Sequence, residues 1–140
     1  MDTAEQLYLA VQHAAVRMRR LDDELGLSPA RFSVLATLRY DGAQRIGELA
    51  RREGVAQPTM TQSVQGLETA GLVARRPEPA DGRSQVIELT PAGRALVRRA
   101  RARKIAWIGD AIADLSPAAR TALHEAAATL DRRALTPDPT

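Results

Sequence analysis

The stretch from Gln57 to Arg83 constrains the fold more than any other part of this 140-residue chain. It opens as a helix, because Pro58 suits a first helical turn and Gly71 suits a left-handed C-cap. Apolar residues at i, i+4 and i+7 predict one buried stripe, made of Met60, Val64 and Leu67. The opposite face carries short, uncharged hydrogen-bonding side chains: Gln57, Thr59, Thr61, Gln62, Ser63 and Gln65. An ordinary solvated face would carry Lys and Glu, whereas amides and hydroxyls suit the edges of base pairs in a major groove.

A β-hairpin is predicted directly after this helix. Residues 72–76 and 84–89 form two short strand patterns, and residues 77–83 between them form a turn rich in Pro, Asp and Gly. The turn places Arg83 at the hairpin tip, where it would reach the DNA backbone or a neighbouring minor groove. Helix and hairpin together predict a winged helix.

The hairpin and the residues after it resemble a known family. LVARRPEPADGRS followed by LTPAGR is similar to the wing and following helix of the MarR family of bacterial transcription regulators, and the likeness extends from Pro29 to Ile112. The family wing reads roughly R-x-x-x-x-x-D-x-R, matched here by Arg75, Asp81 and Arg83. Gly82 departs from the pattern, since a second basic residue often occupies that place.

The resemblance and the polar helix together give a set of expected DNA contacts. The set is Gln57, Pro58, Thr59, Thr61, Gln62, Ser63, Arg75, Asp81 and Arg83. Within it, Asp81 is expected to orient Arg83 or Arg75 through a charge-assisted hydrogen bond. A plain turn at Asp81 and Gly82 is the simpler alternative, and both interpretations hold together.

Further helices are predicted in the rest of the chain, so the predicted fold is mainly α. Ser28-Pro29, Thr90-Pro91 and Ser116-Pro117 each pair a capping residue with a first-turn proline. We predict an N-terminal dimerisation helix in residues 1–28, a winged helix-turn-helix DNA-binding domain in residues 29–90 and C-terminal dimerisation helices in residues 91–140.

Both chain ends carry apolar stripes that the small central core does not need. Residues spaced 4, 3, 4, 3 and 4 apart mark the first helix: Leu7, Val11, Ala14, Met18, Leu21 and Leu25. For this helix alone, packing on its own domain and a dimer seam are equally good interpretations. A twofold homodimer built from both ends covers all the stripes, and the resemblance implies the same arrangement. The helix after the wing begins its stripe at Leu96 and carries five arginines and Lys104, interpreted mostly as a solvated face.

Composition excludes several kinds of chemistry. The chain has no Cys, which removes disulfides, thiolate metal sites and thiol redox switches. His13 and His124 lack companions at metal-ligand spacing, and no phosphate loop or paired catalytic motif is present. No apolar run is long enough to cross a membrane, and the start is not a signal peptide. We expect a cytoplasmic protein that is not an enzyme and needs no cofactor or metal.

The predicted function is sequence-specific DNA binding by a homodimer on a pseudo-palindromic operator, with repression expected rather than activation. The resemblance implies a small aromatic or phenolic effector in a crevice beside the DNA-binding lobe. His13, Arg17, Tyr40 and Trp107 lie on segments expected to border it, although packing in the dimer is the better interpretation of Trp107. Two alternatives remain: a winged-helix module that binds protein, and a ligand-binding protein without DNA binding.

Overall fold

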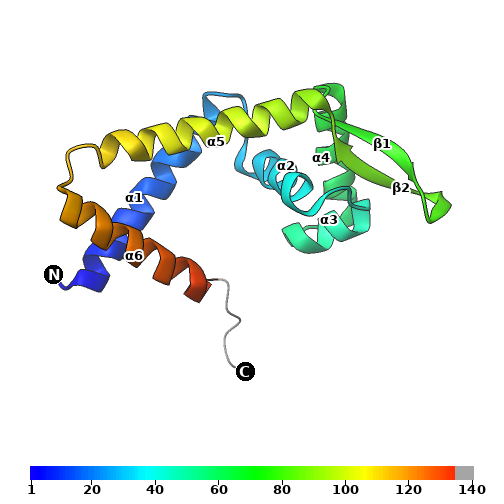
Figure 1. The fold of residues 1–140 in the computed structure, drawn as a ribbon. Coiled ribbons are helices and arrows are strands. Elements are labelled where there is room, and N and C mark those ends of the chain that lie inside the picture. The colour runs from blue at the N-terminus through cyan, green and yellow to red at the C-terminus, as the bar shows by residue number, and fades with distance from the viewer. Residues whose placement is uncertain (135–140) are drawn as a thin grey trace. The chain divides into compact units, whose positions relative to one another are not determined.

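A computed structural model describes residues 1–134 of the chain. Its helices and strands follow in the order α1 (Thr3–Asp23), α2 (Pro29–Asp41), α3 (Ile46–Glu53), α4 (Gln57–Thr69), β1 (Val73–Glu78), β2 (Asp81–Leu89), α5 (Pro91–Ala111) and α6 (Pro117–Ala134). The chain divides into two compact units, residues 1–104 and the segment from Ile105 onward, so that α5 runs from one into the other. The predicted mainly α class with one antiparallel hairpin is confirmed (Figure 1).

The core of the first unit lies among α2, α3, α4 and the hairpin. Its largest fully buried side chains are Leu27, Leu35, Leu49, Met60, Val64, Leu67 and Ile87. The predicted apolar stripe of residues 60, 64 and 67 is therefore confirmed, and it fixes which face of α4 turns outward. Figure 1 shows the hairpin projecting from this group of helices.

Three predicted helix starts are confirmed by side-chain caps. Ser28, Thr90 and Ser116 each accept a backbone N–H three residues ahead, at 3.1–3.2 Å. By contrast, α3 begins after Arg45 and α4 after Ala56, and neither residue caps its helix with a side chain. In these two helices the first-turn N–H groups have no capping side chain as acceptor, although that of Glu48 donates to the Arg45 carbonyl at 3.1 Å.

The hairpin differs from its predicted shape near the tip. The predicted turn of residues 77–83 is too wide, because β1 continues to Glu78 and β2 begins at Asp81, leaving two residues between them. The register shifts there: Pro77 pairs with Gln85 and Glu78 with Asp81, so residues 82–84 bulge from the second strand. Arg83 consequently lies in a bulge just after the tip rather than at the tip.

A backbone bridge fastens the hairpin to the helices. Gln44, in the connection between α2 and α3, donates to the carbonyl of Ile87 at 3.0 Å and accepts from its N–H at 2.7 Å. The base of the wing is therefore hydrogen-bonded to the segment that leads into α3.

The first turn of α5 is joined tightly to the end of α4. The Thr90 hydroxyl donates to the carbonyl of Gly71 at 2.6 Å, and its oxygen accepts the Gly93 N–H at 3.1 Å. Gly71 has the predicted left-handed conformation, with φ of 74°. Gly93 is buried against Leu72, where a β-carbon would lie 2.0 Å from the carbonyl oxygen. Only a glycine fits this approach.

A charged cluster joins α1, α2 and α5 within the first unit. The Lys104 ammonium lies 3.0 Å from Oδ1 and 3.1 Å from Oδ2 of Asp22, but its hydrogen bond goes to Oδ2 alone. Both side chains are largely buried, at 14% and 10% exposure, and the ammonium also lies 3.6 Å from the centre of the Phe32 ring. Arg103 pairs beside them with Glu24. Lys104 is therefore a structural cation, whereas Arg103 forms its ion pair at the surface.

The apolar stripe predicted for α5 is incomplete in its first half, because Leu96 packs against the core without being its most buried position. Gly93, Val97 and Ala100 are the residues buried in its first half, whereas Leu96 is only half-buried. The periodicity missed this because a glycine and an alanine supply two of the three positions.

In the second unit, α6 has no buried residue. Exposed apolar side chains remain at both ends of the described chain: Leu7, Val11, Ile105, Ile108, Leu123 and Leu130. The three predicted segments of residues 1–28, 29–90 and 91–140 stay a prediction. No helix within residues 1–134 is long and apolar enough to span a membrane.

Candidate nucleic-acid interface

The outward face of α4 carries the uncharged polar side chains that its sequence pattern placed there. Gln57, Thr59, Thr61 and Gln62 are exposed, while Ser63 lies half-buried on the flank. The Thr61 hydroxyl donates to the carbonyl of Gln57 at 3.0 Å, so toward an outside partner it offers an acceptor oxygen. The exposed amide of Gln62 has both a donor and an acceptor available. Pro58 is exposed on the first turn of the same helix.

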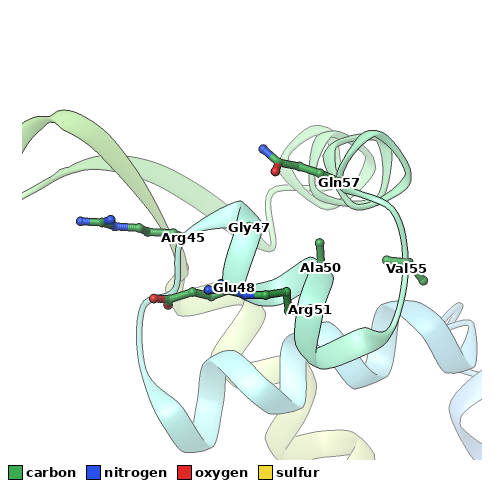
Figure 2. Close-up of a pocket in the computed structure, with 7 residues that line it drawn as sticks. All are labelled: Arg45, Gly47, Glu48, Ala50, Arg51, Val55 and Gln57. Atoms are coloured by element: carbon green, nitrogen blue, oxygen red, sulfur yellow. The ribbon is translucent and has the colours of Figure 1, made fainter.

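A hollow of about 390 Å³ opens beside the start of this helix. Figure 2 shows its lining, which comes from the starts of α3 and α4 and the turn between them: Arg45, Gly47, Glu48, Ala50, Arg51, Val55 and Gln57. Among residues 1–134, Arg51 has no ion-pair partner, whereas its neighbour Arg52 is paired with Asp41 of α2. The predicted contact Gln57 thus shares a hollow with two arginines.

Asp81 organises the backbone of the wing rather than an arginine side chain. Its Oδ1 accepts the backbone N–H of Arg83 and its Oδ2 accepts the Ser84 hydroxyl, both at 3.1 Å. Both hydrogen bonds stabilise the charged carboxylate and hold the pKa of Asp81 below its ordinary value, and the bond from the Arg83 N–H has the larger effect. The predicted bond from Asp81 to a guanidinium is therefore wrong. The simpler interpretation, a turn-forming aspartate, is the one the geometry supports. The Arg83 side chain is exposed on the bulge and pairs with no carboxylate in the described part of the chain.

Arg75 is held by the neighbouring helix instead. Its Nε donates to Glu68 Oε1 at 2.6 Å, which links β1 to α4. The pair stands at the surface, with each side chain about one-third exposed.

Sequence reasoning missed Arg45, which links α3 to the wing. Its Nε donates to Glu78 Oε2 at 2.6 Å, and this bond, together with the charge of the carboxylate, raises the pKa of Arg45 above its ordinary value. The two residues lie 33 positions apart. No periodicity or spacing signals such a pair, because it depends on where the hairpin folds back.

The four residues predicted to border an effector crevice do not form a site within either unit. His13 and Arg17 lie one turn apart on the exposed face of α1, and Tyr40 is 71% exposed at the end of α2. Trp107 is half-buried in the second unit. None of the four lines the hollow beside α4. Within residues 1–134, no group of three or more His, Asp and Glu side chains is placed to hold a metal.

A short helix, a turn, a polar-faced helix and a hairpin define a winged helix-turn-helix, a class of DNA-binding fold. Known proteins share this arrangement. The family model described as MarR family matches residues 27–85. The uncharacterized HTH-type transcriptional regulator Mb0904 of Mycobacterium bovis is 35% identical over 124 residues, covering 89% of this chain and 87% of that one.

Solved structures agree. The transcriptional regulator Tm0710 from Thermotoga maritima superposes with a TM-score of 0.81 at 27% identity, covering 96% of this chain and 97% of that chain. A Staphylococcus aureus MepR mutant bound to an oligodeoxyribonucleotide shares the fold, with a TM-score of 0.73 at 20% identity over 97% of this chain and all of that one. The chain belongs to the MarR family and is an HTH-type transcriptional regulator.

Proposed function

We propose that the chain binds double-stranded DNA, with α4 in the major groove and the hairpin against the backbone or a neighbouring minor groove. The observation that carries the proposal is the outer face of α4, which is exposed, uncharged and rich in hydrogen-bonding groups beside a hollow with two arginines. The proposed contacts are Gln57, Pro58, Thr59, Thr61, Gln62, Ser63, Arg75, Asp81 and Arg83. Asp81 acts through the backbone it holds, and Arg83 contacts DNA directly.

The open starts of α3 and α4 support the same orientation. Thr90 and Ser28 cap their helices with a side-chain oxygen, whereas Arg45 and Ala56 do not, so the N–H groups of Gly47 and Thr59 have no capping side chain as acceptor. Such groups are good donors to phosphate oxygens. Two open helix starts around one hollow favour a backbone phosphate at this place.

A homodimer is the second part of the proposal. Leu7 and Val11 of α1 are exposed, as are Ile105 and Ile108 of α5 and Leu130 of α6, and a second copy of the chain would cover them. Twofold symmetry then places two α4 helices in major grooves about 34–36 Å apart, so that the operator is a pseudo-palindrome. A dimer seated over a promoter blocks polymerase, which favours repression.

The effector and the compartment complete the proposal. A small aromatic or phenolic ligand would bind near His13, Arg17, Tyr40 and Trp107 and favour a dimer whose recognition helices no longer match successive grooves. Because its target is the chromosome, the regulator acts in the cytoplasm.

The direct test is fluorescence anisotropy of the purified chain with a labelled duplex from its own promoter region. A scrambled duplex of the same length and composition is measured beside it at two salt concentrations. Tight, salt-sensitive binding that prefers the promoter is expected. Equal, weak binding to both duplexes favours a protein-binding module, and phenol binding with no duplex binding at low salt favours a ligand-binding protein.

Point variants separate base contacts from phosphate contacts. Gln62→Ala should reduce the preference for the promoter by about 1–3 kcal/mol while affecting the scrambled duplex little. Gln6→Ala is the matched control, because it removes an equally exposed amide from α1, outside α4 and the hairpin. Arg83→Ala should weaken binding to both duplexes and reduce the salt slope by about 1. Equal losses on both duplexes for Gln62→Ala would remove it from the base contacts.

A further inference from the structure

Arg45 occupies an unusual position between the two parts of the proposed interface. It precedes the first residue of α3, it lines the hollow with Gln57 and Arg51, and its guanidinium bonds to Glu78 at the end of β1. The Arg45 side chain is 47% exposed and that of Glu78 is 23% exposed. The pair therefore stands at the surface, within reach of anything that approaches the hollow and the wing together.

Within the part of the chain that the structure describes, Glu78 is the one ion-pair partner of Arg45. The paired guanidinium keeps its charge, but the carboxylate cancels much of its field toward solvent. The charge of Arg75 is likewise offset by a carboxylate, since Arg75 is paired with Glu68 of α4. Arg51, in the same hollow, has no carboxylate bound to it. Some arginines of this surface, Arg45 and Arg75 among them, are thus already paired with a carboxylate before DNA arrives.

An exposed ion pair is a weak restraint, because water and salt compete with it. A phosphate oxygen is a strong acceptor for a guanidinium and can replace a carboxylate in the same geometry. DNA carries closely spaced phosphates, and each cation that neutralises one releases condensed counterions. A duplex seated on α4 would therefore compete with Glu78 for Arg45.

We propose that Arg45 is a phosphate-binding residue and that Glu78 competes with DNA for it, which lowers the affinity for any duplex. The proposal rests on the DNA binding proposed above and adds that Glu78 limits the affinity of that binding. Off DNA, Arg45 is held on the wing by Glu78; on DNA, the guanidinium exchanges the carboxylate for a phosphate oxygen. Because phosphate contacts carry no base information, the restraint acts on operator and random duplexes alike.

The test is a set of four proteins: wild type, Glu78→Gln, Arg45→Gln and the double variant. Each is titrated by anisotropy with promoter and scrambled duplexes across several salt concentrations. Glu78→Gln should raise the affinity for both duplexes about fivefold at 0.1 M salt and leave the salt slope nearly unchanged, because Arg45 contacts a phosphate in both proteins, whereas Arg45→Gln should reduce the slope by about 0.9 per chain. The double variant should lose this gain, because the arginine that Glu78→Gln releases is no longer present.

Glu24→Gln is the matched control. Glu24 forms a surface ion pair with Arg103, outside the wing and α4, so the substitution makes the same change in net charge and removes the carboxylate partner of one arginine, which keeps its hydrogen bond to the Leu21 carbonyl. It should change duplex affinity less than twofold. Thermal unfolding of every variant checks that the wing and helices stay folded.

Each other outcome overturns the proposal in a recognisable way. A lower affinity for Glu78→Gln in a folded protein means that the pair positions the wing. A gain that survives in the double variant means that loss of a negative charge, not release of Arg45, caused it. If wild type binds no duplex at low salt, the proposed function fails together with this inference, whereas wild-type binding without a gain defeats the inference alone.

Discussion

Replacing Gly93 with alanine directs a methyl group into the backbone of Leu72. The new β-carbon would lie 2.0 Å from the Leu72 carbonyl oxygen and 3.2 Å from Cδ2 of Leu89. Real β-carbons essentially never come within 3.0 Å of another atom, so the first turn of α5 must move by about 1 Å. That movement strains the bond from the Thr90 N–H to the Leu72 carbonyl, which is 3.1 Å long.

The size of the effect follows from three contributions. Overpacking a tight site costs about 1–3 kcal/mol, and a lost backbone hydrogen bond costs about 0.5–1.5 kcal/mol. Removing a helical glycine returns about 0.5–1 kcal/mol. We therefore expect Gly93→Ala to lower the free energy of unfolding by about 2–3 kcal/mol. At roughly 4 °C per kcal/mol, the melting temperature falls by about 10 °C.

Urea and thermal unfolding followed by circular dichroism measure this loss. Gly47→Ala is the control, since it makes the same change in a helix of the same unit, where the nearest atom is 3.7 Å away at the flexible end of Gln57. Gly47→Ala should leave the free energy of unfolding unchanged or raise it by up to about 1 kcal/mol. If Gly93→Ala is no less stable than Gly47→Ala, the close approach of α5 to Leu72 is wrong.

Three further predictions concern stability. Lys104→Met should lower the free energy of unfolding by about 3 kcal/mol in urea, because it leaves the Asp22 carboxylate buried without its partner; a loss below about 1 kcal/mol would mean that water reaches the pair. The melting temperature of wild type should exceed that of Asp81→Ala near neutral pH, and the difference should shrink on acidification. The reason is that a depressed pKa stabilises the folded state above the ordinary value of about 3.9 and ceases to do so as the pH falls through the lower folded value; a pH-independent difference contradicts this origin. Ser28→Ala should cost about 1 kcal/mol through the lost cap on α2, and unchanged stability would show that the cap is replaced by solvent.

Most of the fold was predictable from interactions between residues that are close together in the chain. Helix starts were predictable because a capping side chain and the proline after it act within one turn, as at Ser28, Thr90 and Ser116. The buried face of α4 was predictable because a period of 3.6 leaves only one way to cover Met60 and Val64. These signals depend on neighbours in the chain, so one sequence is sufficient to read them.

The wing was less predictable because its details depend on pairing across the hairpin. Pro77 and the Asp81-Gly82 step indicated a long turn, but the strands pair almost to the tip and place the irregularity in the second strand. The carboxylate of Asp81 then satisfies the bulged backbone at Arg83 and has no need of a guanidinium. A pattern of residue types cannot distinguish these two uses of one aspartate.

Contacts between segments distant in the chain could not be predicted from the sequence. Glu78 holds Arg45 and Glu68 holds Arg75, and in each pair the partner is chosen by the folded geometry. The same is true of Arg103, which belongs to a basic cluster predicted to be mostly solvated and which pairs with Glu24 at the end of α1. The number of charged residues is known from the sequence, but which of them form ion pairs is known only from the structure.

The burial of Lys104 has a practical consequence for experiments on this regulator. It is the only lysine in the chain, and its ammonium is enclosed by Asp22 and the ring of Phe32. Acylating reagents that attack free amines will therefore modify this side chain only during the moments when the corner between α1, α2 and α5 opens. The rate of that modification, read by mass spectrometry with and without duplex or candidate effectors, reports the opening of one defined site without any introduced label.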